Sequence, residues 1–218
     1  YGSRIQVVSA DAAIINKSVR FGSLDLDGDR ITNSTPAYAF YAGTSDFALT
    51  IDDCDTVDIE HIKLRDYDSY PIKIGRSVGR VSIGLLDFAT CGTVEATYKA
   101  IILGIGSDAP GVVKIGRAVG VLHSNSHFIF RSDSQLLNID VDNIEVTGGL
   151  FGARVTGRVG RLTLDCDATS GNIVFNTCKD MDFGKSVITN CAAGYGFFDC
   201  DNMFLRDWTA TFGAGLDL

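Results

Sequence analysis

Residues 141–149 read VDNIEVTGG, and this stretch carries the pattern that decides the fold. Val141 is followed by two polar residues, after which apolar Ile144 and Val146 alternate with polar ones. Alternation with a period of two is typical of a strand that buries one face and exposes the other. We therefore predict a short strand here whose apolar side chains point into a core.

Similar phrases recur along the chain: CDTVDIEHIKL from Cys54, VGRVSIGLL from Val78, VGVLHS from Val119, VGRLTLDC from Val159, CKDMDFGKSV from Cys178 and CDNMFLRDW from Cys200. With Val141 included, their starts are 24, 41, 22, 18, 19 and 22 residues apart. The step of 41 is interpreted as two units, one of them poorly marked near residues 98–105. A period of about 20 residues with one short strand per unit is typical of a solenoid.

Strands this short must pair with the strands of the units before and after them. The predicted fold class is all-β, a single-stranded parallel β-helix of about ten coils, roughly 50 Å long at a strand spacing of ~4.8 Å. Equivalent residues should stack in one inward column, formed by Cys54, Val141, Val159, Cys178 and Cys200. We expect one domain over residues 1–218. We also expect a fragment of a longer chain, because the chain starts at Tyr1 and open coil ends leave strand edges unpaired.

Composition favours a soluble core built from short strands and turns. Hydrophobic residues make up 45 % of the chain and charged residues 21 %, with 24 Gly and 3 Pro. The net charge of −8 repels phosphate backbones, so nucleic acid is not an expected partner. No apolar run approaches ~18 residues, so no membrane span is expected either.

The six cysteines are predicted to be reduced, buried thiols. Cys54, Cys178 and Cys200 stand where other units have Val, and a Cys that exchanges with Val behaves as a small apolar residue. Bridged or metal-binding cysteines are the alternatives. The chain has no CxxC pair, which is the usual zinc spacing.

Stacking also predicts where outward carboxylates lie. With the units aligned on their first residues, Glu145 and Asp182 fall in one outward column and Asp165 in the next. Carboxylates roughly 5–10 Å apart are what glycoside hydrolysis requires, so these three residues are the candidate catalytic groups. The alternative is that outward strand positions are simply polar in a chain with 27 acidic residues.

Acids and aromatics alternate in LRDYDSY, residues 64–70. Asp66, Tyr67, Asp68 and Tyr70 are candidate substrate-binding residues, because aromatic faces stack on sugar rings and carboxylates accept hydrogen bonds from hydroxyls. LRDW at residues 205–208 repeats the start of this phrase. The alternative is that Tyr67 and Trp208 close the apolar interior of a coil.

Arg76, Arg117 and Arg158 are each 41 residues apart. If two coils span each interval, they form a ladder with rungs ~10 Å apart. Such a ladder could bind carboxylates or sulfates of an anionic polysaccharide, or pair with aspartates of the intervening coils.

No metal site and no cofactor are predicted. DLDGDR at residues 25–30 lacks the Gly and Glu positions of a calcium loop and is better explained as a tight turn. His123 and His127 have no third ligand at a suitable spacing. No phosphate loop, dinucleotide fingerprint or nucleophile elbow is found.

The units at Cys54, Val141, Val159, Cys178 and Cys200 resemble the coils of right-handed parallel β-helices of the pectate-lyase and phage-tailspike type, over about residues 19–208. This resemblance implies a right-handed helix that binds, cleaves or remodels acidic or cell-surface polysaccharides. The tailspike branch forms homotrimers on virus particles. Pectate lyases pair calcium-binding aspartates with a catalytic arginine, and no complete set of these residues is found here.

The resemblance leads to three alternatives. The first is a tailspike-like or tail-fibre-like module of a virion that recognises a cell-surface glycan, with depolymerase activity left open, as a homotrimer joined to other tail proteins through flanking segments. The second is a non-catalytic spacer or adhesin module. The third is a secreted polysaccharide lyase or epimerase, which would be extracellular.

Overall fold

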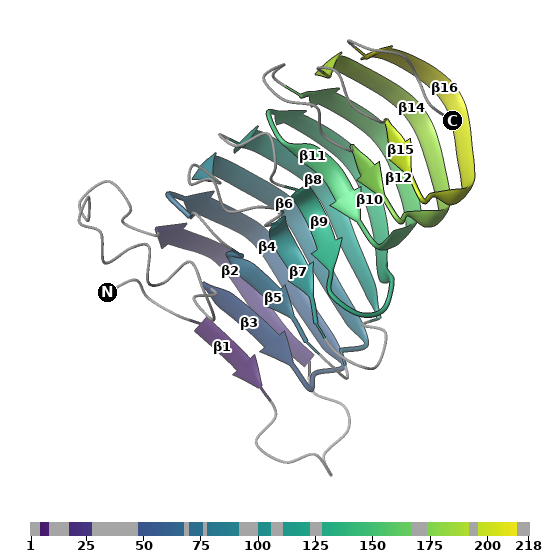
Figure 1. Cartoon of the computed structure of the whole chain (residues 1–218). Helices are drawn as coiled ribbons and strands as arrows, with labels where there is room; N and C mark the ends of the chain where they lie inside the picture. The colour runs from purple at the N-terminus through teal and green to yellow at the C-terminus, as the bar shows by residue number, and fades with distance from the viewer. Residues whose placement is uncertain are drawn as a thin grey trace, which may run out of the picture.

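The computed structural model describes residues 5–8, 18–27, 48–67, 70–75, 78–91, 100–105, 111–122, 128–166, 174–191 and 196–212. In these residues the chain forms strands and their connections, and no helix. The strands alternate along the sequence between two lengths, and each length belongs to its own sheet. Figure 1 shows the two sheets running side by side along the length of the molecule.

The short-strand sheet contains β1 (Ile5–Val8), β3 (Leu49–Asp52), β5 (Ile72–Ile74), β7 (Ala100–Gly104), β9 (Phe128–Ser132), β11 (Leu150–Ala153), β13 (Phe175–Asn176) and β15 (Phe197–Phe198). The long-strand sheet contains β2 (Ser18–Asp27), β4 (Thr56–Arg65), β6 (Arg80–Cys91), β8 (Val112–Leu122), β10 (Leu137–Thr147), β12 (Val155–Asp165), β14 (Lys179–Cys191) and β16 (Asp201–Phe212).

In both sheets each strand pairs in parallel with the strand two elements along the chain. One short and one long strand therefore make one coil, and successive coils stack. This confirms the predicted all-β parallel solenoid. The prediction of one strand per unit was wrong, because each coil has two. With eight described strands in each sheet, the expected count of about ten coils is not confirmed.

Inward residues of the long strands stack in continuous columns, as the alternation predicted. One column contains Ile59, Ile83, Ile115, Val141, Val159 and Phe183, all at most 2 % exposed. Burial of such a side chain contributes about 1.5–3 kcal/mol relative to leaving it in water. The stacked columns are therefore the main source of stability in this fold.

Each long strand bends near its middle, where two residues rather than one separate the inward side chains. Between inward Val159 and Leu162, for example, Gly160 and Arg161 both face outward. Glycine occupies the first of these positions in several coils. At Gly184 an added Cβ would lie 2.2 Å from the main-chain oxygen of Gly160, so a side chain at this position would collide with the neighbouring coil.

A sharp corner leads from each of β11, β13 and β15 to the next long strand. At three successive coils this corner contains one residue with positive φ: Arg154 at 57°, Thr177 at 52° and Asp199 at 51°. The next residue, Val155 or Cys178, is fully buried, and Cys200 in the last of the three is half-buried. The corner thus turns the chain within a single residue and directs the next side chain inward.

The predicted column of five anchors was wrong. Val141 and Val159 are opposite each other in the middle of long strands. Cys178, in contrast, lies at the corner, directly before Lys179 of β14. Val159 pairs instead with Phe183, five residues beyond Cys178. The corner and the bend have the same local pattern of one inward residue, two turning residues and then alternation, so the sequence alone did not separate them.

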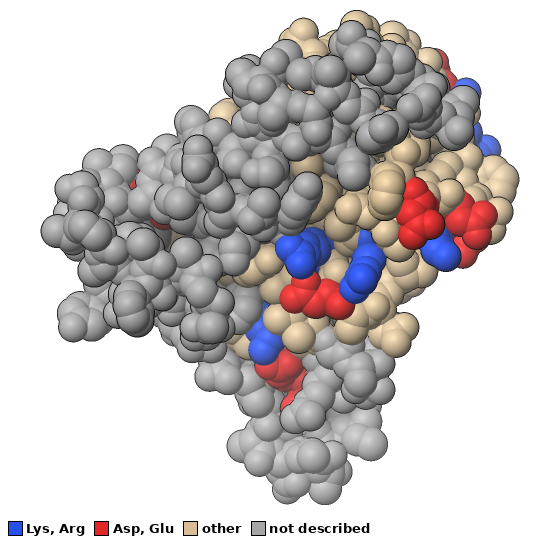
Figure 2. Space-filling model, in the orientation of Figure 1, with Lys and Arg blue, Asp and Glu red and all other residues tan. Residues whose placement is uncertain are grey.

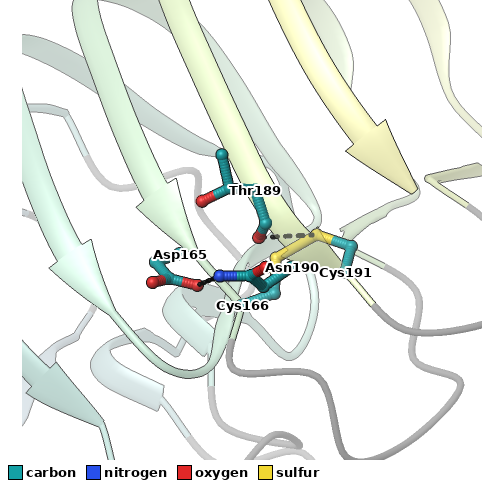
Figure 3. Close-up of a disulfide and its surroundings, with 5 residues drawn as sticks. All are labelled: Asp165, Cys166, Thr189, Asn190 and Cys191. Carbon is teal, nitrogen blue, oxygen red and sulfur yellow. Dashed lines mark hydrogen bonds between the residues drawn. A yellow bond between two sulfur atoms is a disulfide. The ribbon is translucent and has the colours of Figure 1, made fainter. Parts of the chain in front are cut away.

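The prediction that all six cysteines are reduced was also wrong. Cys166 and Cys191 form a disulfide with Cα atoms 4.9 Å apart (Figure 3). Cys166 directly follows β12 and Cys191 is the last residue of β14, and stacking of these neighbouring coils brings the two cysteines together at about the spacing of paired strands. Cys54, Cys91 and Cys178 are buried thiols and Cys200 is a half-buried thiol, as expected of small apolar residues.

Candidate binding site on the outer side of the short-strand sheet

The corner after β9 is wider than the corner of the next coil. Residues 133–136 connect β9 to β10, whereas Arg154 alone connects β11 to β12 in the next coil. The two corners are adjacent in the stack, since Leu137 pairs with Val155. The difference in length leaves Asp133 and its neighbours outside the regular stack, beside the outward residues of β9, β11 and β13.

Arg131 is the best-positioned cation at this corner. It is outward on β9, where it pairs with Ala153 of β11. Its guanidinium contacts the Asp133 carboxylate at 3.0 Å and donates a hydrogen bond of 3.1 Å to the Tyr70 hydroxyl oxygen. The guanidinium carbon also lies 6.0 Å from the centre of the Tyr70 ring, within the range of a cation–π contact. These contacts orient Arg131 before any ligand binds.

Arg154 is the second cation at this corner. Its Nη1 donates a hydrogen bond of 2.6 Å to the main-chain oxygen of Asp133, so it ties the wide corner to the narrow one. Arg154 is exposed, and much of its donor capacity remains for other acceptors, because a guanidinium carries five N–H groups.

A hollow of about 640 Å³ opens over these residues, a size typical of small-ligand sites. It is lined by Phe128, Arg131, Ser132, Asp133, Ala153, Arg154, Asn176 and Thr177. The described lining contains two arginines and one aspartate, and therefore an excess of positive charge in a chain of net charge −8. Figure 2 shows basic and acidic side chains alternating across this side of the molecule.

Tyr70 remains protonated at neutral pH. Burial raises the pKa of its hydroxyl, the Arg131 guanidinium opposes this rise, and the Asp133 carboxylate adds to it. The oxygen of this neutral phenol accepts the hydrogen bond from Arg131. Tyr70 does not line the hollow but contacts Arg131, which does, and its substrate-binding role stays a prediction.

The other residues of the predicted aromatic cluster have different positions. Tyr67 packs against the core, as does Trp208, which agrees with the alternative that they close the interior. Asp66 has a φ of 60° and lies at the turn after β4. Asp68 lies outside the described residues.

The three candidate catalytic carboxylates are not brought together as predicted. Glu145 pairs with Thr163, and Asp165 pairs with Thr147, so these two columns are neighbours as expected. Asp182 pairs with Arg158, in a column on the other side of the bend. The five-residue shift described above accounts for this correction.

Each of these carboxylates already has a donor partner. Glu145 accepts from Asn143 at 2.8 Å and from Arg117 at 2.7 Å, and these hydrogen bonds lower its pKa. Asp182 accepts two hydrogen bonds from Arg206, which lower its pKa. Asp165 accepts from Asn190 at 2.9 Å (Figure 3). The lowered pKa values keep Glu145 and Asp182 ionised at neutral pH, whereas a general acid needs a raised pKa.

The predicted arginine ladder was wrong for its described members. Arg117 pairs with Asn143, whereas Arg158 pairs with Asp140 and Asp182 in a different column. Arg158 contacts Asp140 at 2.8 Å and Asp142 at 3.0 Å, so it matches the alternative in which arginines pair with aspartates. Arg76 lies outside the described residues.

Sequence reasoning missed Arg131, Asp133 and Arg154. They belong to no recurring phrase, because they lie at the ends of short strands and in corners. The usable signal was spacing: β10 starts 25 residues after β8, but β12 starts only 18 residues after β10. A longer coil beside a shorter one indicates extra corner residues on the surface.

The chain matches no protein-family model, no curated protein and no solved structure. Within the described ranges, no three His, Cys, Asp or Glu side chains gather as a metal site would require. The described part of the chain also contains no helix long and apolar enough to cross a membrane.

Proposed function

We propose that this solenoid recognises a polysaccharide through the hollow lined by Arg131, Asp133 and Arg154. The observation that carries the proposal is the preformed arrangement of Arg131, fixed between Tyr70 and Asp133 at the edge of a hollow with excess positive charge. Fixed guanidinium groups bind carboxylates in a forked geometry and also donate to hydroxyls. Asn176 and Thr177 add amide and hydroxyl groups to the same lining.

Binding without cleavage is favoured over hydrolysis. The described lining contains one carboxylate, Asp133, whereas a glycosidase needs a pair. Glu145 and Asp182 lie on the long-strand sheet with lowered pKa values, which suits ion pairing better than proton donation. The proposal includes the finer expectations from the resemblance: a right-handed helix of the pectate-lyase and tailspike type, presented on a virion tail or outside a cell, as a homotrimer that engages a cell-surface glycan.

The test is binding to a panel of bacterial capsular polysaccharides and lipopolysaccharides, measured by biolayer interferometry. The informative variant is Arg154→Asn, because Asn removes the guanidinium and tolerates the positive φ of this position. We expect at least about a tenfold loss of affinity, the equivalent of ~1.4 kcal/mol, for the glycan that binds the unmodified chain.

The matched control is Arg206→Gln, which removes an exposed arginine from the long-strand sheet and should leave binding unchanged. Equal affinity of Arg154→Asn and the unmodified chain would reject the hollow as the site. Release of reducing ends from the bound glycan would favour the depolymerase alternative, and Asp165→Ala would then test the carboxylates.

A further inference from the structure

A second pair of cysteines lies in stacked positions, at the corners that begin β14 and β16. Lys179 pairs with Asp201, so the residues before them, Cys178 and Cys200, are opposite each other on neighbouring coils. The Asp201 N–H donates a hydrogen bond of 3.0 Å to the main-chain oxygen of Cys178, which fixes this register. The Sγ of Cys178 itself donates to the main-chain oxygen of Gly152, at 3.5 Å.

The same molecule contains a disulfide between neighbouring coils. Asp165 pairs with Thr189, so Cys166 and Cys191 are offset by one residue, at positive-φ Asn190, and their Cα atoms are 4.9 Å apart. Residues directly opposite on paired parallel strands are separated by about 4.8 Å, inside the range that a disulfide requires. Cys178 and Cys200 therefore have the backbone geometry for a bond between the coil of β14 and that of β16.

The two thiols differ in access to solvent. Cys178 is fully buried, whereas Cys200 is half-buried. The Sγ of Cys200 lies 3.4 Å from the main-chain oxygens of Phe175 and Phe198, to which its neutral thiol donates. The neighbouring Cys178 side chain lowers the pKa of Cys200 to about 7, while Cys200 and burial raise the pKa of Cys178.

We propose that Cys178 and Cys200 form a thiol-exchange site, in which Cys200 attacks small disulfides and Cys178 then closes a second inter-coil disulfide. This inference stands on the stacked geometry and does not depend on glycan binding. Cys200 is the nucleophile because its thiol is accessible to solvent, whereas the Cys178 thiol is buried. A dissolved disulfide therefore reaches only the sulfur of Cys200.

The chemistry balances with a small disulfide such as glutathione disulfide as the oxidant. The Cys200 thiolate attacks one sulfur of glutathione disulfide, which forms a mixed disulfide and expels one glutathione thiolate. Cys178 then loses its proton and attacks the Cys200 sulfur, which expels the second glutathione. Two protein thiols are oxidised to one disulfide, and glutathione disulfide is reduced to two glutathione molecules.

The experiment treats the full chain with glutathione disulfide near neutral pH, quenches with acid, blocks remaining thiols with N-ethylmaleimide and maps the peptides by mass spectrometry. We expect a peptide cross-linked through Cys178 and Cys200, formed before any adduct at buried Cys54 or Cys91. A stable glutathione adduct at Cys200 without the cross-link would overturn the proposal, as would faster reaction at Cys54 or Cys91.

Two variants separate the roles of the two sulfurs. Cys178→Val should stop the reaction at the glutathione adduct of Cys200, and Cys200→Val should leave Cys178 unmodified. Valine fits such a corner, because Val78 is the stacked neighbour of Cys54 in the coils of β4 and β6. The matched control, Cys54→Val, should form the Cys178–Cys200 bond as the unmodified chain does, and a failure there would count against the proposal.

Discussion

The two sheets of this solenoid differ in regularity. The long strands have 10 to 13 residues, and their side chains alternate between the core and an outer face of ion pairs. The short strands have 2 to 5 residues, and several are buried on both faces, as β7 is along its whole length. The comparison teaches that the long-strand sheet supplies the repeated core contacts, while irregular corners beside the short strands supply the surface available for a ligand.

The largest expected effect tests the core side of this comparison. Phe183 is inward on β14, and its ring contacts Phe151 at 5.3 Å, Phe175 at 5.5 Å and Trp208 at 6.0 Å between centroids. Phe183→Ala should lower the free energy of unfolding by about 3–5 kcal/mol, because the ring leaves a cavity among packed aromatics. Urea unfolding monitored by circular dichroism measures this change.

Phe204 is the control for that substitution. It is outward on β16 and 62 % exposed, so Phe204→Ala should change the free energy of unfolding by no more than about 0.5 kcal/mol. Similar losses from both substitutions would mean that the inward columns do not dominate stability.

An intermediate effect is expected at the bend of the long strands. Gly184→Ala places a methyl group against the main-chain oxygen of Gly160, and the coils must shift to accept it. We expect a loss of about 1–3 kcal/mol in the free energy of unfolding.

The matched variant at the bend is Gly22→Ala, since Gly22 has no atom within 4 Å of the added Cβ. This substitution should be neutral or stabilising by up to about 1 kcal/mol, because alanine restricts the unfolded chain. If thermal unfolding ranks the two alanine variants in the reverse order, close stacking at the bend is not what selects glycine.

The smallest effect concerns the outer face of the long-strand sheet. The Arg206 guanidinium lowers the pKa of Asp182, so this carboxylate is more acidic in the folded chain than in the unfolded one. Its contribution to stability is therefore fully present above the unfolded pKa of about 3.9 and is lost as pH falls through the lower folded pKa. The measurement is the unfolding midpoint of Asp182→Asn and the unmodified chain across the acidic range.

The unmodified chain should be slightly more stable at neutral pH, and the two midpoints should converge in acid. Added salt should reduce the difference at neutral pH, because the pair is exposed. A difference that widened on acidification would contradict the assigned direction of the pKa change.

Much of the long-strand sheet could be predicted from the sequence. Alternation correctly placed Ile144 and Val146 inward and Glu145 outward, because one face of these strands is buried. The short strands could not be recognised by alternation. AIILG in β7 and FIF in β9 are continuous apolar runs, as expected of parallel strands buried on both faces, and such runs give no period.

The register could not be predicted, and two errors share that cause. The corner at Cys178 and the bend at Phe183 have the same local pattern, and their confusion displaced Asp182 into the column of Glu145. It also hid the disulfide. Once Val159 is paired with Phe183, Cys166 comes seven residues after the first and Cys191 eight residues after the second, next to each other across the stack.

Of the residues around the hollow, sequence reasoning singled out only Tyr70, which contacts Arg131 and does not itself line the hollow. Arg131 and Arg154 act together because stacking places β9 and β11 side by side, and their separation in sequence contains no motif. Such a site depends on the length of one corner relative to the next, which is a property of the assembled coils.

The positive-φ corners bear on how the outer surface beside the short strands can evolve. Arg154, Thr177 and Asp199 differ in size and charge, yet all three adopt nearly the same backbone angle. A corner of this kind therefore accepts side chains of different chemistry at one backbone angle. Arg154 and Thr177 line the hollow, so substitutions at these two positions would change its polar groups while the buried interior stays as it was.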